Sequence, residues 1–176
     1  GYASSTRYGG EFDRLAFLAN INRPPAIKFK DLQAAITTNI RYNILPFQVR
    51  TDYVKVTDDT VLAGLTLSVQ NKDLAFQGSS GVQKSVVNIF GQITTLTRRT
   101  VQTFEDTLSL DVPDSLLDQS LEKPSVYWKS IPLRPGLYRL SLAIKDVNSG
   151  NVGTMELRME VPEFKEGQLA TSSLIL

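Results

Sequence analysis

The stretch RPGLYRLSLAIKDVNSGNVGTMELRMEVP, from Arg134 to Pro162, decides the fold of this chain. Apolar and polar side chains alternate along it, and a period of two places one row on a buried face and the other in water. The apolar row comprises Tyr138, Leu140, Leu142 and Ile144, then Met155, Leu157, Met159 and Val161. Between the halves, residues 146–151 combine side chains that bond their own backbone with a glycine, as is typical of a turn. Pro162 has no N–H to donate and ends the second strand, so the stretch predicts a β-hairpin.

Alternating rows of the same kind recur upstream of this hairpin. The clearest lie at residues 61–69 and 104–112, and they are expected to supply the packing partners of its inner faces. Further elements are predicted as follows: strands at residues 36–42, 47–56, 74–76, 82–97 and 125–133, a bulge near Asp52, a flexible loop at 77–81 and a short helix at 113–121. Seven to nine short strands with one or two short helices predict a mainly β chain, folded as an antiparallel immunoglobulin-like β-sandwich.

The sequence also predicts how the chain is divided. Residues 1–32 are expected to form an N-terminal linker with a short helix at 11–20 and an extended strap. Residues 33–163 would form the sandwich, and residues 164–176 a C-terminal tail or connection. The chain starts at Gly1 rather than at a methionine, which indicates a piece of a longer protein.

Composition narrows the classes of function. Lys and Arg number 19 against 18 Asp and Glu, a formal net charge of +1, so no long-range field would draw the chain to nucleic acid. No apolar run reaches the length of about 18 residues that a spanning helix needs, so no membrane insertion is expected. The absence of Cys and His removes disulfides, thiolate chemistry and the commonest general base and metal ligand. We therefore expect no cofactor and no enzymatic activity.

Two groups of carboxylates are the candidates for metal binding or catalysis. Asp58 and Asp59, with Asp52, could form an oxygen-rich calcium site, but the spaced DxDxDG ligand pattern is missing and a solvated turn is the favoured interpretation. Glu105-Asp106 and Asp111 could act as paired catalytic carboxylates. Adjacent residues of a strand face opposite ways, so exposed strand charge is the favoured interpretation of that group.

Tyr127 and Trp128 are candidates for a partner contact. Tyr127 shares the phase of Ile131, so Trp128 is expected to point to the other face of its strand. A surface Trp would mark a binding or interdomain contact. The favoured interpretation is instead that Trp128 packs under the helix expected at residues 113–123.

Arg98 and Arg99 are the second pair of candidates. Together with Lys84 they could contact an acidic partner, or they could be the solvated arginines of a turn. No interleaved aromatic residues support stacking on nucleic acid bases.

Two resemblances to known proteins extend these expectations. Pro-Gly-Leu-Tyr at residues 135–138 resembles the tyrosine corner of immunoglobulin-like sandwiches, in which the Tyr hydroxyl bonds upstream backbone. Four strings resemble the C-terminal region of bacterial GWxTD domain-containing proteins: RPPAIKFKDL (23–32), RYNILPFQVRTDYVKVTDDTVL (41–62), VNIFGQITTLTRRTVQTFEDTLSLDVP (87–113) and LRPGLYRLSLAIKDVNSGNVGT (133–154). This second resemblance runs from about Phe12 to Leu176. The Gly-Trp-x-Thr-Asp motif itself is absent from the chain.

The family resemblance implies an exported, multidomain bacterial protein in which an immunoglobulin-like module follows the namesake domain. It therefore implies an extracytoplasmic location, whether periplasmic, on the cell surface or secreted. It supplies no activity or site residue. Two functions remain open: a module that contacts neighbouring domains or other proteins, and a structural unit that pairs with copies of itself through an edge strand or through segments 21–32 and 169–176.

Overall fold

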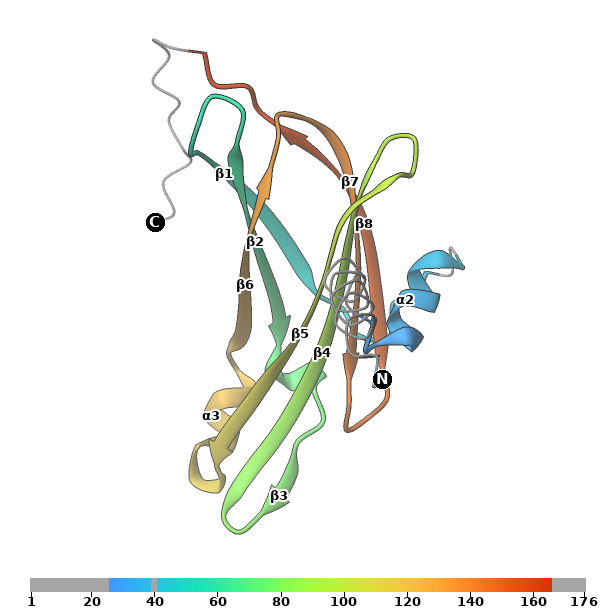
Figure 1. The fold of residues 1–176 in the computed structure, drawn as a ribbon. Coiled ribbons are helices and arrows are strands. Elements are labelled where there is room, and N and C mark those ends of the chain that lie inside the picture. The colour runs from blue at the N-terminus through green and yellow to red at the C-terminus, as the bar shows by residue number, and fades with distance from the viewer. Residues whose placement is uncertain (1–25, 39–40, 166–176) are drawn as a thin grey trace, which may run out of the picture.

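Two antiparallel sheets pack face to face in a computed structural model that describes residues 26–38 and 41–165 (Figure 1). The three-stranded sheet has the order β1 (Gln48–Lys55), β2 (Val61–Gln70), β6 (Pro124–Leu133). The five-stranded sheet has β5 (Thr100–Pro113), β4 (Val82–Thr95), β7 (Gly136–Asp146) and β8 (Val152–Val161) in adjacent positions, and β3 (Gln77–Ser79) pairs with the start of β4. The helical elements are α2 (Lys30–Thr37), η1 (Asn71–Asp73), η2 (Asp114–Leu116) and α3 (Leu117–Leu121). The predicted mainly β, immunoglobulin-like sandwich is thus confirmed.

The hairpin that decides the fold is β7 and β8, and β7 lies between β4 and β8 in the five-stranded sheet. Leu140, Leu142 and Ile144 are fully buried, as the alternation predicts. They join the buried row of β2, which includes Leu65 and Leu67, in one hydrophobic cluster between the sheets. Each such aliphatic side chain contributes about 1.5–3 kcal/mol when it leaves water, so the facing rows hold the two sheets together.

The turn and corner of this hairpin are fixed by polar contacts. The Tyr138 hydroxyl donates to the backbone oxygen of Arg134 at 2.9 Å, so the predicted tyrosine corner is confirmed. At the other end of β7 the Asp146 carboxylate is fully buried. It accepts from the backbone N–H of Ala75 at 2.8 Å and from the Ser149 hydroxyl at 2.7 Å. Asp146 therefore ties the β7–β8 turn to the segment before β3.

One prediction is wrong at the start of the sandwich, where residues 36–42 were expected to form a strand. Helix α2 occupies residues up to 37 instead. Leu32 and Ala35, three residues apart, are its buried side chains. Leu32 packs on the outer face of the five-stranded sheet against Phe90 and Ala143. The apolar pattern of a helix and that of a short strand look alike over so few residues. The packing of Leu32 against Phe90 and Ala143 decides in favour of the helix. It also explains why β4 is apolar on both faces.

The expected boundary between residues 32 and 33 falls inside α2. The residues just before that boundary are fastened to the sheet by side chains of β5 and β7. The Glu105 carboxylate accepts the backbone N–H groups of Lys28 and Phe29 at 3.0 and 2.7 Å. Lys145 Nζ lies 2.9 Å from Asp31 Oδ2, and this hydrogen bond is the main reason that the pKa of Asp31 lies below its usual value. The helix expected at 11–20 lies outside the described residues, as does the tail beyond residue 165.

Two smaller predictions are also wrong. The bulge expected near Asp52 is absent, because the β1–β2 register runs unbroken from Gln48 to Lys55. Val54 and Val56 are exposed. In the sequence, these outward-facing valines look like a switch of the apolar row from one face of the strand to the other. A register shift occurs instead in the β4–β5 pair.

The loop expected at residues 77–81 contains a strand, and the strand expected at 74–76 is irregular. Positive φ angles of 52° and 82° at Ser80 and Gly81 make a tight two-residue turn, which lets β3 pair with β4. Among the described residues no helix is long and apolar enough to span a bilayer.

Candidate functional site

The outer face of the three-stranded sheet carries an exposed tryptophan. Trp128 is 64% exposed, so the favoured interpretation that it packs under the 113–123 helix is wrong. It lies on β6 opposite Thr66 of β2, which in turn lies opposite Arg50 of β1. A Cβ added to Gly64 would lie 3.6 Å from Trp128 Nε1, so the indole ring lies over β2 at this glycine.

The residues around Trp128 mix apolar and charged groups. Val126 and Val54 are more than half exposed at two ends of the same face. Arg50 Nε pairs with Asp52 Oδ2 at 3.4 Å on β1. The face thus presents an aromatic ring, exposed valines and a guanidinium on one surface, which we call the Trp128 face.

Tyr127 points the other way, into the open side of the sandwich. Its hydroxyl donates to Asp106 Oδ2 of β5, and Lys129 Nζ lies 3.1 Å from the same oxygen. Burial, the hydrogen bond to Asp106 and the charge of Asp106 raise the pKa of Tyr127. The prediction that Tyr127 and Trp128 face opposite ways is confirmed. Tyr127 joins the two sheets and does not share a surface with Trp128.

The carboxylates of β5 are separated as the strand geometry predicts. Glu105 points outward and binds the backbone before α2, whereas Asp106 points inward to Tyr127. Asp111 is exposed further along the strand, opposite Lys84 of β4. These three groups do not converge, and two of them are engaged in structural contacts.

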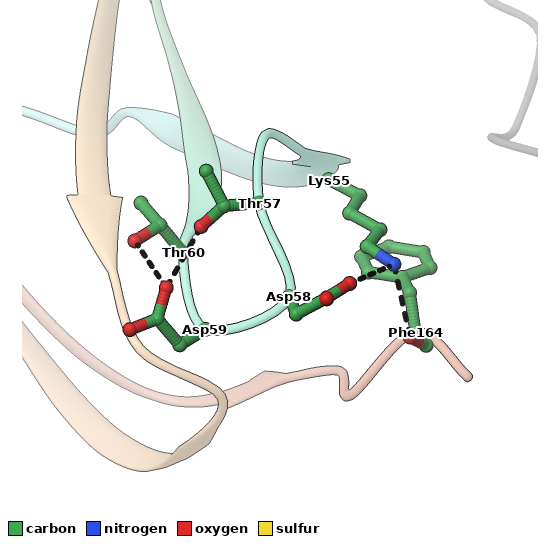
Figure 2. Close-up of polar contacts among 6 residues, drawn as sticks. All are labelled: Lys55, Thr57, Asp58, Asp59, Thr60 and Phe164. Atoms are coloured by element: carbon green, nitrogen blue, oxygen red, sulfur yellow. Dashed lines mark hydrogen bonds and ion pairs between the residues drawn. The ribbon is translucent and has the colours of Figure 1, made fainter. Parts of the chain in front are cut away.

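Asp58 and Asp59 point apart at the β1–β2 turn (Figure 2). Asp58 Oδ1 pairs with Lys55 Nζ at 2.9 Å. Asp59 Oδ1 accepts from the hydroxyls of Thr57 at 2.8 Å and Thr60 at 3.4 Å, and the Thr57 hydrogen bond is the main cause that lowers the pKa of Asp59.

The same turn contacts the end of the sandwich. Lys55 Nζ also donates to the backbone oxygen of Phe164 at 3.4 Å, which places the chain after β8 beside the turn (Figure 2). Asp52, the third expected ligand, pairs with Arg50 on the Trp128 face. Within residues 26–38 and 41–165 no group of three or more acidic, His or Cys side chains could hold a metal ion.

The two arginines of the β4–β5 turn point into different grooves. Arg98 adopts φ 65° and its N–H bonds the Thr95 oxygen at 3.0 Å, so the predicted turn is confirmed. The Arg98 side chain lines a groove beside α2, whereas Arg99 lines a second groove beside Tyr138. Lys84 lies near the opposite end of β4, so it cannot join the two arginines on one ligand.

The groove beside α2 contains residues that the sequence does not mark as a site. Arg139 and Ser141 lie in the outward phase of β7 and look like solvated strand positions. Arg41 lies in the segment expected to be a strand. Their convergence depends on α2, the helix that the sequence pattern does not predict.

No protein-family model matches this chain, and a search of curated proteins finds no match. Similar solved structures include three Bacteroides proteins. A glycosyl hydrolase family 2 member from Bacteroides cellulosilyticus matches over 68% of this chain and 15% of its own, with 14% identity and a TM-score of 0.47. A calcium-binding mutant of Bacteroides uniformis beta-glucuronidase 2 matches over 65% of this chain and 13% of its own, with 11% identity and a TM-score of 0.44.

A putative beta-galactosidase from Bacteroides fragilis matches over 65% of this chain and 16% of its own, with 13% identity and a TM-score of 0.42. This chain therefore spans only a small part of the length of each. Similarities at this level assign no family, ligand or activity, and the fold class rests on the strand pairing of the chain itself.

Proposed function

We propose that this chain is a non-catalytic interaction module of an exported bacterial multidomain protein. It contacts neighbouring domains or other proteins through the Trp128 face. The observation that carries this proposal is the 64% exposure of Trp128 on the outer face of the three-stranded sheet. A Trp buries about 150–250 Å² when fully covered. Since 64% of Trp128 is still exposed, covering that part at roughly 25 cal/mol per Å² would contribute about 2–4 kcal/mol.

The neighbours of Trp128 fit a protein contact. Trp and Arg are the residues most enriched among those that dominate binding energy, and Arg50 lies in the same cross-strand row as Trp128. Val126 and Val54 extend the apolar area on either side. A face of this kind is typical of a protein-binding surface in which a central aromatic side chain is surrounded by both apolar and charged side chains.

The carboxylates support a non-catalytic role. Asp106 links the sheets through Tyr127 and Lys129, and Glu105 holds the backbone before α2. A catalytic pair needs two carboxyl groups directed at one substrate, and these two point to opposite faces of β5. The resemblance to GWxTD domain-containing proteins is what supports export and membership of a larger protein.

Site-specific photocrosslinking tests the proposal. A photoreactive phenylalanine analogue replaces Trp128 in the full-length protein in its host cell, and the matched control carries it at Val147, which is also exposed but lies in the β7–β8 turn. We expect crosslinks to a protein or a neighbouring domain from position 128 and few from position 147. Equal crosslinking at both positions, or none at 128, would refute a contact through the Trp128 face. Protease digestion of intact cells tests the extracytoplasmic location.

Strand addition is a second candidate function, favoured by the sheet edges. Among the described strands, β6 pairs only with β2, and β5 only with β4. By contrast, part of β8 is covered, since Leu45 N–H donates to the Val152 oxygen and Thr154 N–H to the Tyr42 oxygen. Self-pairing at an open edge predicts dimers by sedimentation that survive Trp128→Ala. Dimers that this substitution abolishes would instead indicate contact through the Trp128 face.

A further inference from the structure

A groove of about 620 Å³ lies on the face of the molecule opposite the Trp128 face. It runs over the outward side chains of β7 and β8, between the C-terminal part of α2 and the β4–β5 turn. Its polar lining includes Arg41, Arg98, Arg139, Ser141, Thr154 and Glu156. These residues come from four separate segments, and the fold alone brings them together.

The groove is positively charged. Arg139 Nε pairs with Glu156 Oε1 at 3.4 Å. Neither Arg41 nor Arg98 forms an ion pair with any described residue. Three guanidinium groups against one carboxylate leave a net charge of about +2 at the groove, in a chain whose overall formal charge is +1.

Arg98 occupies a backbone position that favours glycine. Its φ of 65° lies in the left-handed region, which a side chain with a Cβ adopts only against a steric penalty. Arg98 nevertheless occupies this position and lines the groove. Strained backbone of this kind clusters at binding sites, where the surrounding structure maintains it.

Ser141 places a hydroxyl at the groove. The residue is only 8% exposed, yet it lines the cavity. The neighbouring Thr154 hydroxyl is already engaged, since its oxygen accepts from the Tyr42 N–H at 3.0 Å. Ser141 is therefore the hydroxyl that a group in the groove can bond.

We propose that this groove binds a small hydroxylated oxyanion, a carboxylate or phosphate monoester that also carries hydroxyl groups. The oxyanion lies at Arg98, whose planar guanidinium fork matches carboxylate and phosphate oxygens. The hydroxyl groups of the ligand bond Ser141 and Glu156. The volume of the groove lies within the range of about 300–1,000 Å³ found for small-molecule sites.

The strand register and the charge of Glu156 orient the ligand. Arg139 lies opposite Thr94, toward the β4–β5 turn that carries Arg98. Glu156 lies opposite Ser141, two residues further along β7. The Glu156 carboxylate repels an anion and accepts hydrogen bonds from hydroxyl groups. The oxyanion therefore belongs at the Arg98 end and the hydroxylated part beside Ser141 and Glu156. This site does not depend on the function proposed for the Trp128 face, which lies on the other sheet.

Calorimetric titration of the full 176-residue chain tests this assignment. The probes are 6-phosphogluconate, gluconate, inorganic phosphate and, as the uncharged comparison, glucose. We expect binding of 6-phosphogluconate or gluconate, weakening as salt is added, and no binding of glucose. The stronger of the two binders identifies the oxyanion as phosphate or carboxylate.

Matched variants locate the site. Arg98→Gln should weaken binding about tenfold or more, as expected for one charge-assisted contact, and Arg99→Gln from the same turn should leave it unchanged. Arg98→Gly removes the guanidinium while relaxing the turn, so it should bind as weakly as Arg98→Gln without loss of stability. Ser141→Ala should weaken binding of the hydroxylated probes and leave inorganic phosphate unaffected.

Three results would overturn the proposal. They are no heat of binding for any probe at millimolar concentration, equal losses in Arg98→Gln and Arg99→Gln, and tighter binding of a tetraglutamate peptide than of every small probe. The last would assign the groove to an acidic protein segment instead.

Discussion

Gly91→Ala is expected to destabilise the sandwich because Phe104 already fills the space that the new methyl group needs. Gly91 lies within β4 and pairs directly with Phe104 on β5. A Cβ built on Gly91 would lie 2.7 Å from Cε2 of the Phe104 ring and closer still to Cζ and Cε1. Carbon atoms pack at about 3.5–4.0 Å, so the ring or the strand must move. Phe104 is 6% exposed and belongs to the main core, which leaves the ring little room.

The size of the effect depends on how the Phe104 ring responds to the new methyl group, and two responses are available. Forcing the ring aside within the core is overpacking, which costs about 1–3 kcal/mol. Expelling the ring into water costs about 1.5–3 kcal/mol of lost burial. Alanine is favoured over glycine in a strand by about 0.5–1 kcal/mol, which offsets part of either cost. The expected net loss in the free energy of unfolding is about 1–2 kcal/mol, measured by urea unfolding followed by circular dichroism.

A double-mutant cycle distinguishes this clash from a general intolerance of β4. Phe104→Leu alone should cost about 1 kcal/mol or more for lost volume. In the double variant the clash is absent, so the combined loss should fall short of the sum by at least about 1 kcal/mol. Gly64→Ala is the matched control on β2, where the new Cβ makes only an ordinary 3.6 Å contact. Additive losses, or a Gly91→Ala variant as stable as Gly64→Ala, would refute this account of Gly91.

Three further outcomes are expected. Because burial and Asp106 raise the pKa of Tyr127, the native state holds this proton more tightly than the unfolded chain, whose Tyr pKa is about 10. The resulting stability is complete below about pH 10 and is lost as pH rises above it, so unfolding free energy should fall more steeply there in the native chain than in Tyr127→Phe. Ser85→Ala should raise the urea midpoint, with a gain of about 1 kcal/mol, because the buried Ser85 hydroxyl has no partner among the described residues; an unchanged or lower midpoint would contradict this. Glu105→Gln should weaken the hydrogen bonds to the backbone N–H groups of Lys28 and Phe29 by about 1–2 kcal/mol. Amide exchange in α2 should then be faster, with no change in β2. Equal protection of α2 in both proteins would contradict this.

The sandwich was predictable because most of its strands alternate cleanly. β2 places apolar residues at every second position and its burial alternates in that order, whereas β7 is buried on both faces from Leu140 to Ile144 because α2 covers its outer side. The same parity correctly predicts that Tyr127 and Trp128 face opposite ways. It cannot predict what lies over either face, since that depends on segments distant in the sequence. The prediction that Trp128 packs under a helix fails for this reason.

Helix α2 shows a second limit of periodicity. Leu32 and Ala35 are apolar at helical spacing, yet Ile36 and the residues after it also alternate. Eight residues are too few for either period to dominate, and the choice depends on Phe90, about fifty residues away, which needs a cover. The groove beside α2 could not be predicted for the same reason, because residues of this helix form one of its sides.

Each outer face of the sandwich carries an outward-facing aromatic ring, and the described chain covers only one of the two rings. On the five-stranded sheet, Phe90 projects outward and is fully buried, because α2 lies over it and is held there by Glu105 and by the Asp31–Lys145 pair. On the three-stranded sheet, Trp128 projects outward in the same manner, yet no described segment lies over it. An aromatic ring on a sheet loses the same hydration whether its cover comes from its own chain or from another protein. The contrast between Phe90 and Trp128 therefore favours a cover for Trp128 that belongs to a neighbouring domain or partner, and this is the contact that crosslinking from position 128 would trap.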